Sequence, residues 1–115
     1  MKLILAIIQP HRLESVKKAL SQVEVVRMTI MDCHGFDQYD EPSAVYGTDE
    51  FALNLRRKVQ LQIAVNEEFV QPTIAAIVAG GRGGEKGAHG DGKIFVLPLE
   101  DCVRIRTGER GTAAI

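Results

Sequence analysis

The chain has 115 residues, of which 45% are hydrophobic and 25% are charged, and its formal net charge is −1. This length and composition are typical of one globular domain, so residues 1–115 are expected to share a single core. The basic residues form no long block, which argues against a nucleic-acid-binding surface that makes many phosphate contacts. No apolar run approaches the length of a membrane span, so direct membrane insertion is not expected.

Cysteine usage favours a cytoplasmic protein. Cys33 and Cys102 lie far apart and belong to no Cys-x-x-Cys motif, so two reduced thiols are the expectation. The apolar N-terminus stops at Pro10, which is too soon for a signal peptide, and no cleavage motif follows it.

The first part of the chain alternates between strand and helix patterns. Residues 2–8 form a nearly continuous apolar run, typical of a central strand, and Pro10 ends it. Apolar residues then recur at helical spacing over residues 13–23. Residues 25–33 alternate as a second strand does, whereas the segment 36–55 shows neither period, as a functional or disordered loop does.

The second part repeats the alternation. Residues 58–65 switch regularly between apolar and polar side chains and predict a third strand. Asn66 is predicted to cap a helix that ends at Gly80-Gly81, and Pro72 predicts either a later start or a kink in that helix. Two short strands are predicted near the end of the chain, over residues 94–97 and 102–106.

The order of these elements predicts an α+β fold of the ferredoxin-like βαββαβ type. Its four-stranded antiparallel sheet carries two helices on one face and leaves the other face open. On the predicted register the open face holds Val25, Met31 and Ala64, which are too apolar to be left in water. Self-association through this face is therefore expected.

A glycine-rich run is the strongest local signal for a binding site. Seven of the eleven glycines fall between positions 80 and 92, and Lys93 follows them. Glycines let several backbone N–H groups converge on one anion, and a lysine adds a positive charge. The spacing Gly87-x4-Gly92-Lys93 imitates a P-loop, but Ile94 stands where a magnesium-binding Ser or Thr is needed, and a strand follows instead of a helix. A slack surface loop is the alternative.

Arg104 and Arg106 favour the binding site. They are two residues apart on a predicted strand, so both side chains leave one face while Val103 and Ile105 pack inward. Two neighbouring guanidiniums without acids between them favour a bound anion. The alternative is ordinary pairing at a solvated edge, with Glu85, Glu100 or Asp101 as the partners.

Catalysis finds little support, so the chain is predicted not to be an enzyme. The three histidines are isolated in sequence, and no nucleophile elbow or zinc-type ligand spacing occurs. Cys33 and His34 are adjacent on a strand and point to opposite faces, which favours a structural role over a metal site.

Several stretches together resemble the PII family, the trimeric signalling regulators of nitrogen metabolism. They cover nearly the whole chain, and the most specific are Gly-Asp-Gly-Lys-Ile-Phe and Arg-Ile-Arg-Thr-Gly-Glu. The matching stretches are Ala6-Ile7-Ile8 with Pro10, Met28-Thr29, Gly35-Phe36, residues 90–96, residues 103–109 and the closing Ala114-Ile115.

The resemblance implies a homotrimer that binds ATP or ADP, with magnesium as a possible companion, in clefts between its subunits. Thr29 and the backbone at Ala64 would contact the adenine base of the nucleotide. The remaining nucleotide contacts implied are Asp37, Gln38, Gly90, Asp91, Gly92, Lys93, Arg104 and Arg106. The segment from about Asp37 to Leu55 would be the family's T-loop, through which the regulator controls a membrane transporter or an enzyme.

The chain departs from the family at the base of that loop. Asp37, Gln38 and Tyr39 replace the usual Gly-Arg-Gln, and Gln9 replaces the common lysine before Pro10. Phe51 and Asp49 stand where some members carry a modified tyrosine or serine. Nucleotide binding is expected to be kept, whereas 2-oxoglutarate as a second effector, at Tyr39 and Lys58, stays open.

Two other readings of the resemblance remain. One is a PII-like sensor of another small molecule, such as bicarbonate or AMP. The other is a trimeric metal-ion tolerance protein of similar architecture, for which Cys33, His34 and Cys102 are the candidate ligands.

Overall fold

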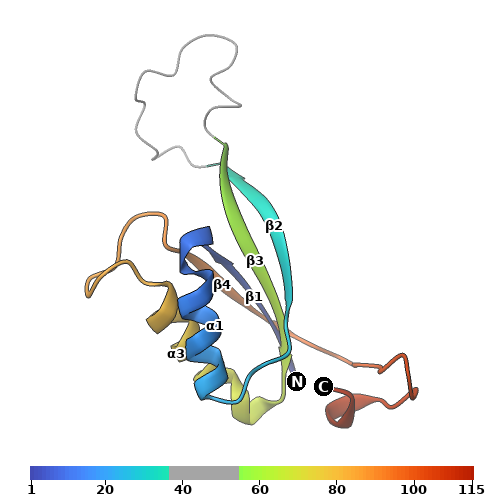
Figure 1. Ribbon diagram of the computed structural model, residues 1–115. Coiled ribbons are helices and arrows are strands. Elements are labelled where there is room, and N and C mark those ends of the chain that lie inside the picture. Colours follow the sequence, from blue (N-terminus) through green and yellow to red (C-terminus); the bar gives the residue numbers. More distant parts are fainter. Residues whose placement is uncertain (37–54) are drawn as a thin grey trace.

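A computed structural model describes residues 1–36 and 55–115 of the chain. Neither of its two α-helices is long and apolar enough to cross a membrane within this described part. The elements, in chain order, are β1 (Lys2–Ile8), α1 (Leu13–Gln22), β2 (Thr29–Phe36), β3 (Leu55–Val65), α3 (Glu67–Gly81) and β4 (Gly92–Pro98), with 3₁₀ turns at Pro10–Arg12 and Gly111–Ala114 (Figure 1).

The four strands form one antiparallel sheet in the order β2-β3-β1-β4. Both helices cover the same face of this sheet, and the segment after β4 extends away from it (Figure 1). The predicted ferredoxin-like βαββαβ arrangement is therefore confirmed, with β1 at the centre between β3 and β4.

Alternate residues of the central strands build the core beneath the helices. Ile4 of β1 lies directly opposite Ile63 of β3, and both side chains are fully buried. Val16 and Leu20 of α1 are one helical turn apart and close the core from above. The alternation predicted from the sequence for residues 58–65 is the observed burial pattern of β3.

The helices approach each other closely at a glycine. A Cβ atom placed on Gly80 of α3 would lie 2.7 Å from the Cα of Val16 and 2.8 Å from the carbonyl oxygen of Ser15. The Ser15 hydroxyl donates a 2.6 Å hydrogen bond to the Gly80 carbonyl across the same contact. A side chain at position 80 would therefore push the two helices apart.

The second strand begins later than predicted, at Thr29 instead of Val25. Glu24 has a φ of 66° and reverses the chain after α1, with the Glu24 N–H bonded to Ser21 and the Val25 N–H to Leu20. This is a Schellman motif, which brings Val25 back against Leu20. Val25 is consequently 6% exposed in the core, and the prediction that it lies on the open face is wrong.

The predicted last strand over residues 102–106 is also absent from the described part of the chain. A single bridge joins Val103 to Arg110, and the chain turns back sharply at Gly108, whose φ is 74°. No residue of the described ranges 1–36 and 55–115 covers this turn, so Ile105 is 100% exposed. The expectation that Val103 and Ile105 pack inward is wrong for the single chain.

Helix α3 begins at Glu67 despite Pro72, so the predicted later start is wrong. Proline removes the hydrogen bond to the carbonyl of Glu68, and Glu68 lies on the exposed side of the helix, where that loss costs less than in the core. Asn66 occupies the predicted cap position with extended backbone, but its side chain makes no cap bond. Its Nδ2 donates instead to the carbonyl of Thr112, at 3.3 Å.

Replacing Gly80 by alanine should lower the free energy of unfolding by about 1–3 kcal/mol, because the added carbon must displace the backbone of α1. Gly81→Ala is the matched control: its new carbon would meet its nearest atoms at 3.7 and 3.9 Å, which is ordinary contact. Urea unfolding of both variants at one protein concentration checks this, and equal stability of the two would contradict the close-contact account.

Candidate functional site

The face of the sheet away from the helices, called the open face below, is mostly apolar. Directly opposed residues share a face in an antiparallel sheet, so Leu5 of β1 and Phe95 of β4 lie side by side there. Phe95 is 49% exposed and Met31 37% exposed in the single chain. The predicted apolar open face is confirmed for Met31 and Ala64, and the β1 and β4 side chains extend it.

A groove of about 810 Å³ lies at one end of the sheet. Thr29 and Ala64, the predicted contacts of the base, both line it. The C-terminal residues Ala114 and Ile115 form another part of the wall, and Phe69 of α3 adds an aromatic side chain. A mostly apolar groove with a few polar groups is the usual form of a small-molecule site.

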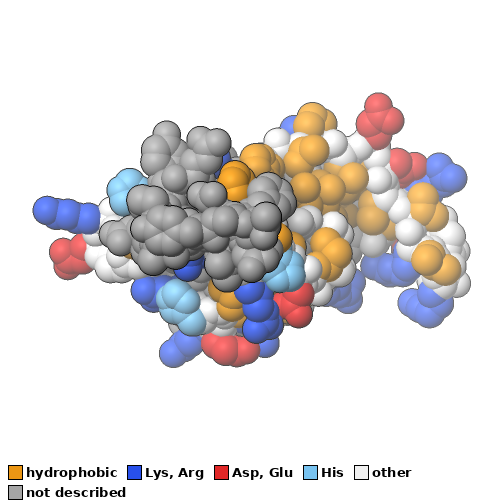
Figure 2. Space-filling model, turned by 90° about the horizontal axis from the view of Figure 1, so that it is seen from above, with side chains coloured by type: hydrophobic (Ala, Val, Ile, Leu, Met, Phe, Trp, Pro, Cys, Tyr) orange, Lys and Arg blue, Asp and Glu red, His pale blue; other side chains and the backbone are white. Residues whose placement is uncertain are grey.

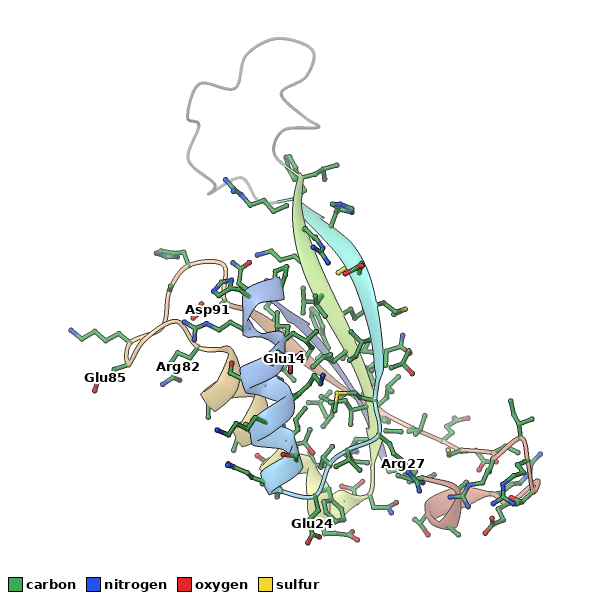
Figure 3. All side chains as sticks on the ribbon, in the orientation of Figure 1. Glu14, Glu24, Arg27, Arg82, Glu85 and Asp91 are labelled. Atoms are coloured by element: carbon green, nitrogen blue, oxygen red, sulfur yellow. The ribbon has the colours of Figure 1, made fainter. Side chains whose placement is uncertain are left out.

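The glycine-rich loop between α3 and β4 is organised by Asp91. The Asp91 carboxylate accepts hydrogen bonds from the backbone N–H groups of Gly83, at 3.0 Å, and Ala88, at 2.8 Å. These two donors, and then the nearby guanidiniums of Arg12 and Arg82, hold the pKa of Asp91 below its ordinary value. Figure 3 shows Asp91 at the base of this loop. Its carboxylate therefore stabilises the loop from within.

The turn around Asp91 depends on two glycines with left-handed backbone, one on each side of it. Gly92 has a φ of 119°, and a Cβ atom there would lie 1.7 Å from the carbonyl oxygen of Ile7. Gly90 has a φ of 88°, and its carbonyl oxygen accepts hydrogen bonds from Gln9 Nε2 at 2.8 Å and Lys58 Nζ at 3.1 Å. Lys58, predicted as a contact of the second effector, thus touches the predicted phosphate turn in the ligand-free chain.

A smaller hollow of about 240 Å³ lies beside this turn. Asp91, Gly92 and Lys93 line it together with the end of α3 and the end of β1. Of the four consecutive residues predicted to contact the phosphates, Asp91, Gly92 and Lys93 line this hollow and Gly90 does not. The Lys93 side chain is exposed there.

The two predicted arginines differ in their surroundings. Arg104 donates to the carboxylate of Glu109, at 3.1 Å, and to the carbonyl of Ala113, at 3.2 Å, and its side chain is 28% exposed. The proposed acid partners Glu85, Glu100 and Asp101 do not take this role, and Asp101 pairs with Arg110 instead. Arg106 is exposed and makes no hydrogen bond or ion pair with the described residues.

Figure 2 shows Lys and Arg side chains gathered at the right-hand end of the molecule, where Figure 1 places the segment after β4. Arg104 lies near the groove, because it donates to the carbonyl of Ala113, and the adjacent Ala114 forms part of the groove wall. The segment that carries Arg106 therefore begins and ends at the same end of the sheet as the groove (Figure 1).

The groove and the glycine turn are separate within one chain. Ala64 lies opposite Leu3 of β1, whereas Lys93 lies opposite Ile7, which is about 13 Å further along the strand at a rise of about 3.3 Å per residue. The described residues of the predicted site therefore fall into two groups, which a single chain does not bring together. Three predicted site residues, Asp37, Gln38 and Tyr39, lie outside the described residues.

Two residues of this region were missed by the sequence analysis. Glu109 follows Arg104 by five positions, and only the reversal at Gly108 brings the two together. Gln9 was noted only as a replacement for the family's common lysine before Pro10, and nothing in the sequence marked it as a contact of the glycine turn. For the metal-site alternative, the described part of the chain holds no group of three or more His, Cys, Asp or Glu side chains able to bind a metal ion.

Comparison with known proteins identifies relatives along the full chain. The family described as Nitrogen regulatory protein P-II matches residues 1–109. Nitrogen regulatory protein GlnK1 of Methanosarcina mazei is 45% identical over 115 residues, which is 100% of this chain and 97% of the relative. Nitrogen regulatory protein P-II of Nostoc punctiforme is 37% identical over the full length of both chains. The crystal structure of Arabidopsis thaliana PII bound to citrate has a TM-score of 0.76 and 36% identity, and covers 98% of this chain and 87% of that one.

The amide signals of Gly83 and Ala88 should report the ionisation of Asp91. Because the folded pKa is lowered, the carboxylate stabilises the loop above the ordinary value of about 3.9, and this contribution is lost as the pH falls through the lower folded value. In an NMR titration both amides should shift together with a midpoint below 3.9.

Asp91→Asn should abolish this titration, and Glu85→Gln, at the outer tip of the same loop in Figure 3, should leave it unchanged. A midpoint at or above the ordinary value would show that the two N–H groups do not stabilise the charged carboxylate.

Proposed function

The chain belongs to the nitrogen regulatory protein P-II family, and from that premise we propose that it is a non-catalytic signalling regulator that binds ATP or ADP between the subunits of a homotrimer. The observation that carries the proposal is the division of the predicted nucleotide site. The groove with Thr29 and Ala64 lies at one end of the sheet, and the turn with Gly90 and Lys93 lies at the other.

The open face supports the trimer. Leu5, Phe95 and Met31 would leave a large apolar surface in water if the chain stayed alone, and burying it against copies of itself is favourable. Ile105, fully exposed in the single chain, also needs a cover of this kind. Association would bring the groove of one subunit within reach of the glycine turn of its neighbour.

In this arrangement the two halves of the site hold different parts of the nucleotide. Thr29 and the backbone at Ala64 take the base in the apolar groove, and the same subunit supplies Arg106 and Arg104. The neighbour supplies the turn from Gly90 to Lys93 for the phosphates. Arg106 pairs with none of the described residues, whereas Arg104 pairs with Glu109 and bonds to the carbonyl of Ala113 in the C-terminal segment.

The chemistry of the turn supports binding without catalysis. A phosphoryl-transfer site needs a group that positions the attacking water. The carboxylate nearest the turn, Asp91, is instead engaged by Gly83 and Ala88. Control of a membrane transporter or an enzyme would pass through the segment between β2 and β3, with magnesium and a second small molecule as possible co-ligands.

Calorimetry with ATP, ADP and AMP, each with and without magnesium, 2-oxoglutarate or bicarbonate, tests the proposal. ATP or ADP should bind the wild-type protein. A change in nucleotide affinity on adding magnesium, 2-oxoglutarate or bicarbonate identifies a co-ligand. Binding of AMP alone would favour the alternative of a PII-like sensor of another molecule. Failure of every adenine nucleotide to bind would overturn the proposal.

Arg106→Ala should weaken ATP binding by roughly ten- to a hundredfold, because a hydrogen-bonded cation is lost from the phosphates. The thermal midpoint should stay unchanged, since Arg106 makes no contact that stabilises the described part of the fold. Arg110→Ala is the matched control, an exposed arginine of the same segment that pairs with Asp101. Equal affinity losses in the two variants would mean that Arg106 acts only through general charge.

A further inference from the structure

Gln9 is the unexpected contact of the glycine turn. We propose that Gln9 is a positioning residue for nucleotide binding: with Lys58 it holds the carbonyl of Gly90, and it keeps that carbonyl in place when a bound phosphate draws Lys58 away. This inference rests on the proposed binding of ATP or ADP at the same turn. A neutral amide suits this role, whereas a second cation at position 9 would not.

The backbone at Gln9 is fixed before any ligand arrives. Gln9 follows the last residue of β1, whose Ile8 lies opposite Gly92 of the turn. Its φ of −70° and ψ of 139° are the extended geometry to which a residue before proline is restricted. The Gln9 carbonyl also accepts the N–H of Arg12, at 3.0 Å. Its side chain therefore starts from a rigid base and reaches Gly90 at 2.8 Å.

Lys58 reaches the same carbonyl from the neighbouring strand. Ile8 of β1 lies opposite Val59 of β3, so Lys58 stands beside Gln9. The two donors differ in charge: the ammonium of Lys58 is a mobile cation with three N–H groups, and the Gln9 amide is neutral. The Lys58 ammonium gains more from a phosphate than from a carbonyl, because the phosphate oxygen carries a full negative charge that adds direct attraction to the hydrogen bond.

A phosphate bound at the turn would therefore compete with Gly90 for Lys58. Lys58 would move from a neutral carbonyl to a charged oxygen, and the carbonyl would keep Gln9 as its donor. A cation at position 9 would be drawn to the phosphate as well and would release the carbonyl. The neutral amide gains less from such a move, so it continues to hold the backbone.

Holding this carbonyl matters because the turn is costly to order. Gly90 and Gly92 both adopt left-handed backbone, and glycine loses more conformational freedom on ordering than any other residue. Asp91 fixes the part of the loop before the turn through Gly83 and Ala88. Gln9 fixes Gly90 itself, so that less freedom remains to be lost when the nucleotide binds.

The test uses the full-length protein, with Gln9→Met as the main variant. Methionine keeps the length and volume of the side chain but cannot donate a hydrogen bond. Gln22→Met makes the same change at an exposed position at the end of α1 and is the matched control. ATP affinity is measured by calorimetry, and hydrogen exchange is measured at the Asp91 amide, which donates to Ala88 at 3.2 Å.

Gln9→Met should weaken ATP binding by roughly two- to tenfold, the range expected for one neutral hydrogen bond. In the ligand-free variant Lys58 still holds Gly90, so exchange at Asp91 should change little. In the ATP-saturated variant exchange should be at least twofold faster than in the saturated wild-type protein. Gln9→Glu should weaken ATP binding further, because its carboxylate attracts Lys58 and repels the phosphates.

Three results separate the possibilities. Wild-type affinity and exchange in Gln9→Met would overturn the proposal while leaving nucleotide binding intact. Equal acceleration of exchange with and without ATP would also overturn it, because Gln9 would then only support the fold. A wild-type protein that binds no adenine nucleotide would overturn the proposed function first, and this proposal with it.

Discussion

The site depends on one close backbone contact, between Gly92 at the start of β4 and the carbonyl of Ile7 in β1. A Cβ atom at position 92 would lie 1.7 Å from that carbonyl oxygen, so only glycine allows β4 to pair with the central strand at this point. The pairing in turn fixes where Gly90 and Lys93 lie. Without it, Gln9 and Lys58 could not reach the turn, whereas the bonds of Asp91 to Gly83 and Ala88 lie within the loop itself.

Much of the fold follows from periodicity, because the pattern of buried residues is set by the sheet. The alternation over residues 58–65 correctly predicted which side of β3 faces the helices. The failures occur where the chain leaves that pattern. Val25 looked like a strand residue, but the left-handed Glu24 turns it into the core. Val103 looked like part of a strand, but it finds only an isolated bridge to Arg110.

The sequence predicted the kind of site, a glycine-rich turn followed by a lysine, better than it predicted which residues contact that turn. The run of glycines before Lys93 predicted the turn, because glycine adopts left-handed backbone more readily than any other residue. The partners of that turn were not visible, since Gln9 and Lys58 meet Gly90 only through strand pairing across distant parts of the chain. Arg104 and Arg106 were expected to act as a pair, yet Arg104 pairs with Glu109, whereas Arg106 has no partner among the described residues.

The central claim is that nucleotide binding needs more than one chain, because the groove and the glycine turn lie at opposite ends of the same sheet. Native mass spectrometry of the protein with ATP and ADP tests this most directly. The account predicts a trimer that carries up to three nucleotides and a monomer that carries none. A monomer with bound nucleotide, or a trimer that takes up no nucleotide at saturating concentration, would contradict it.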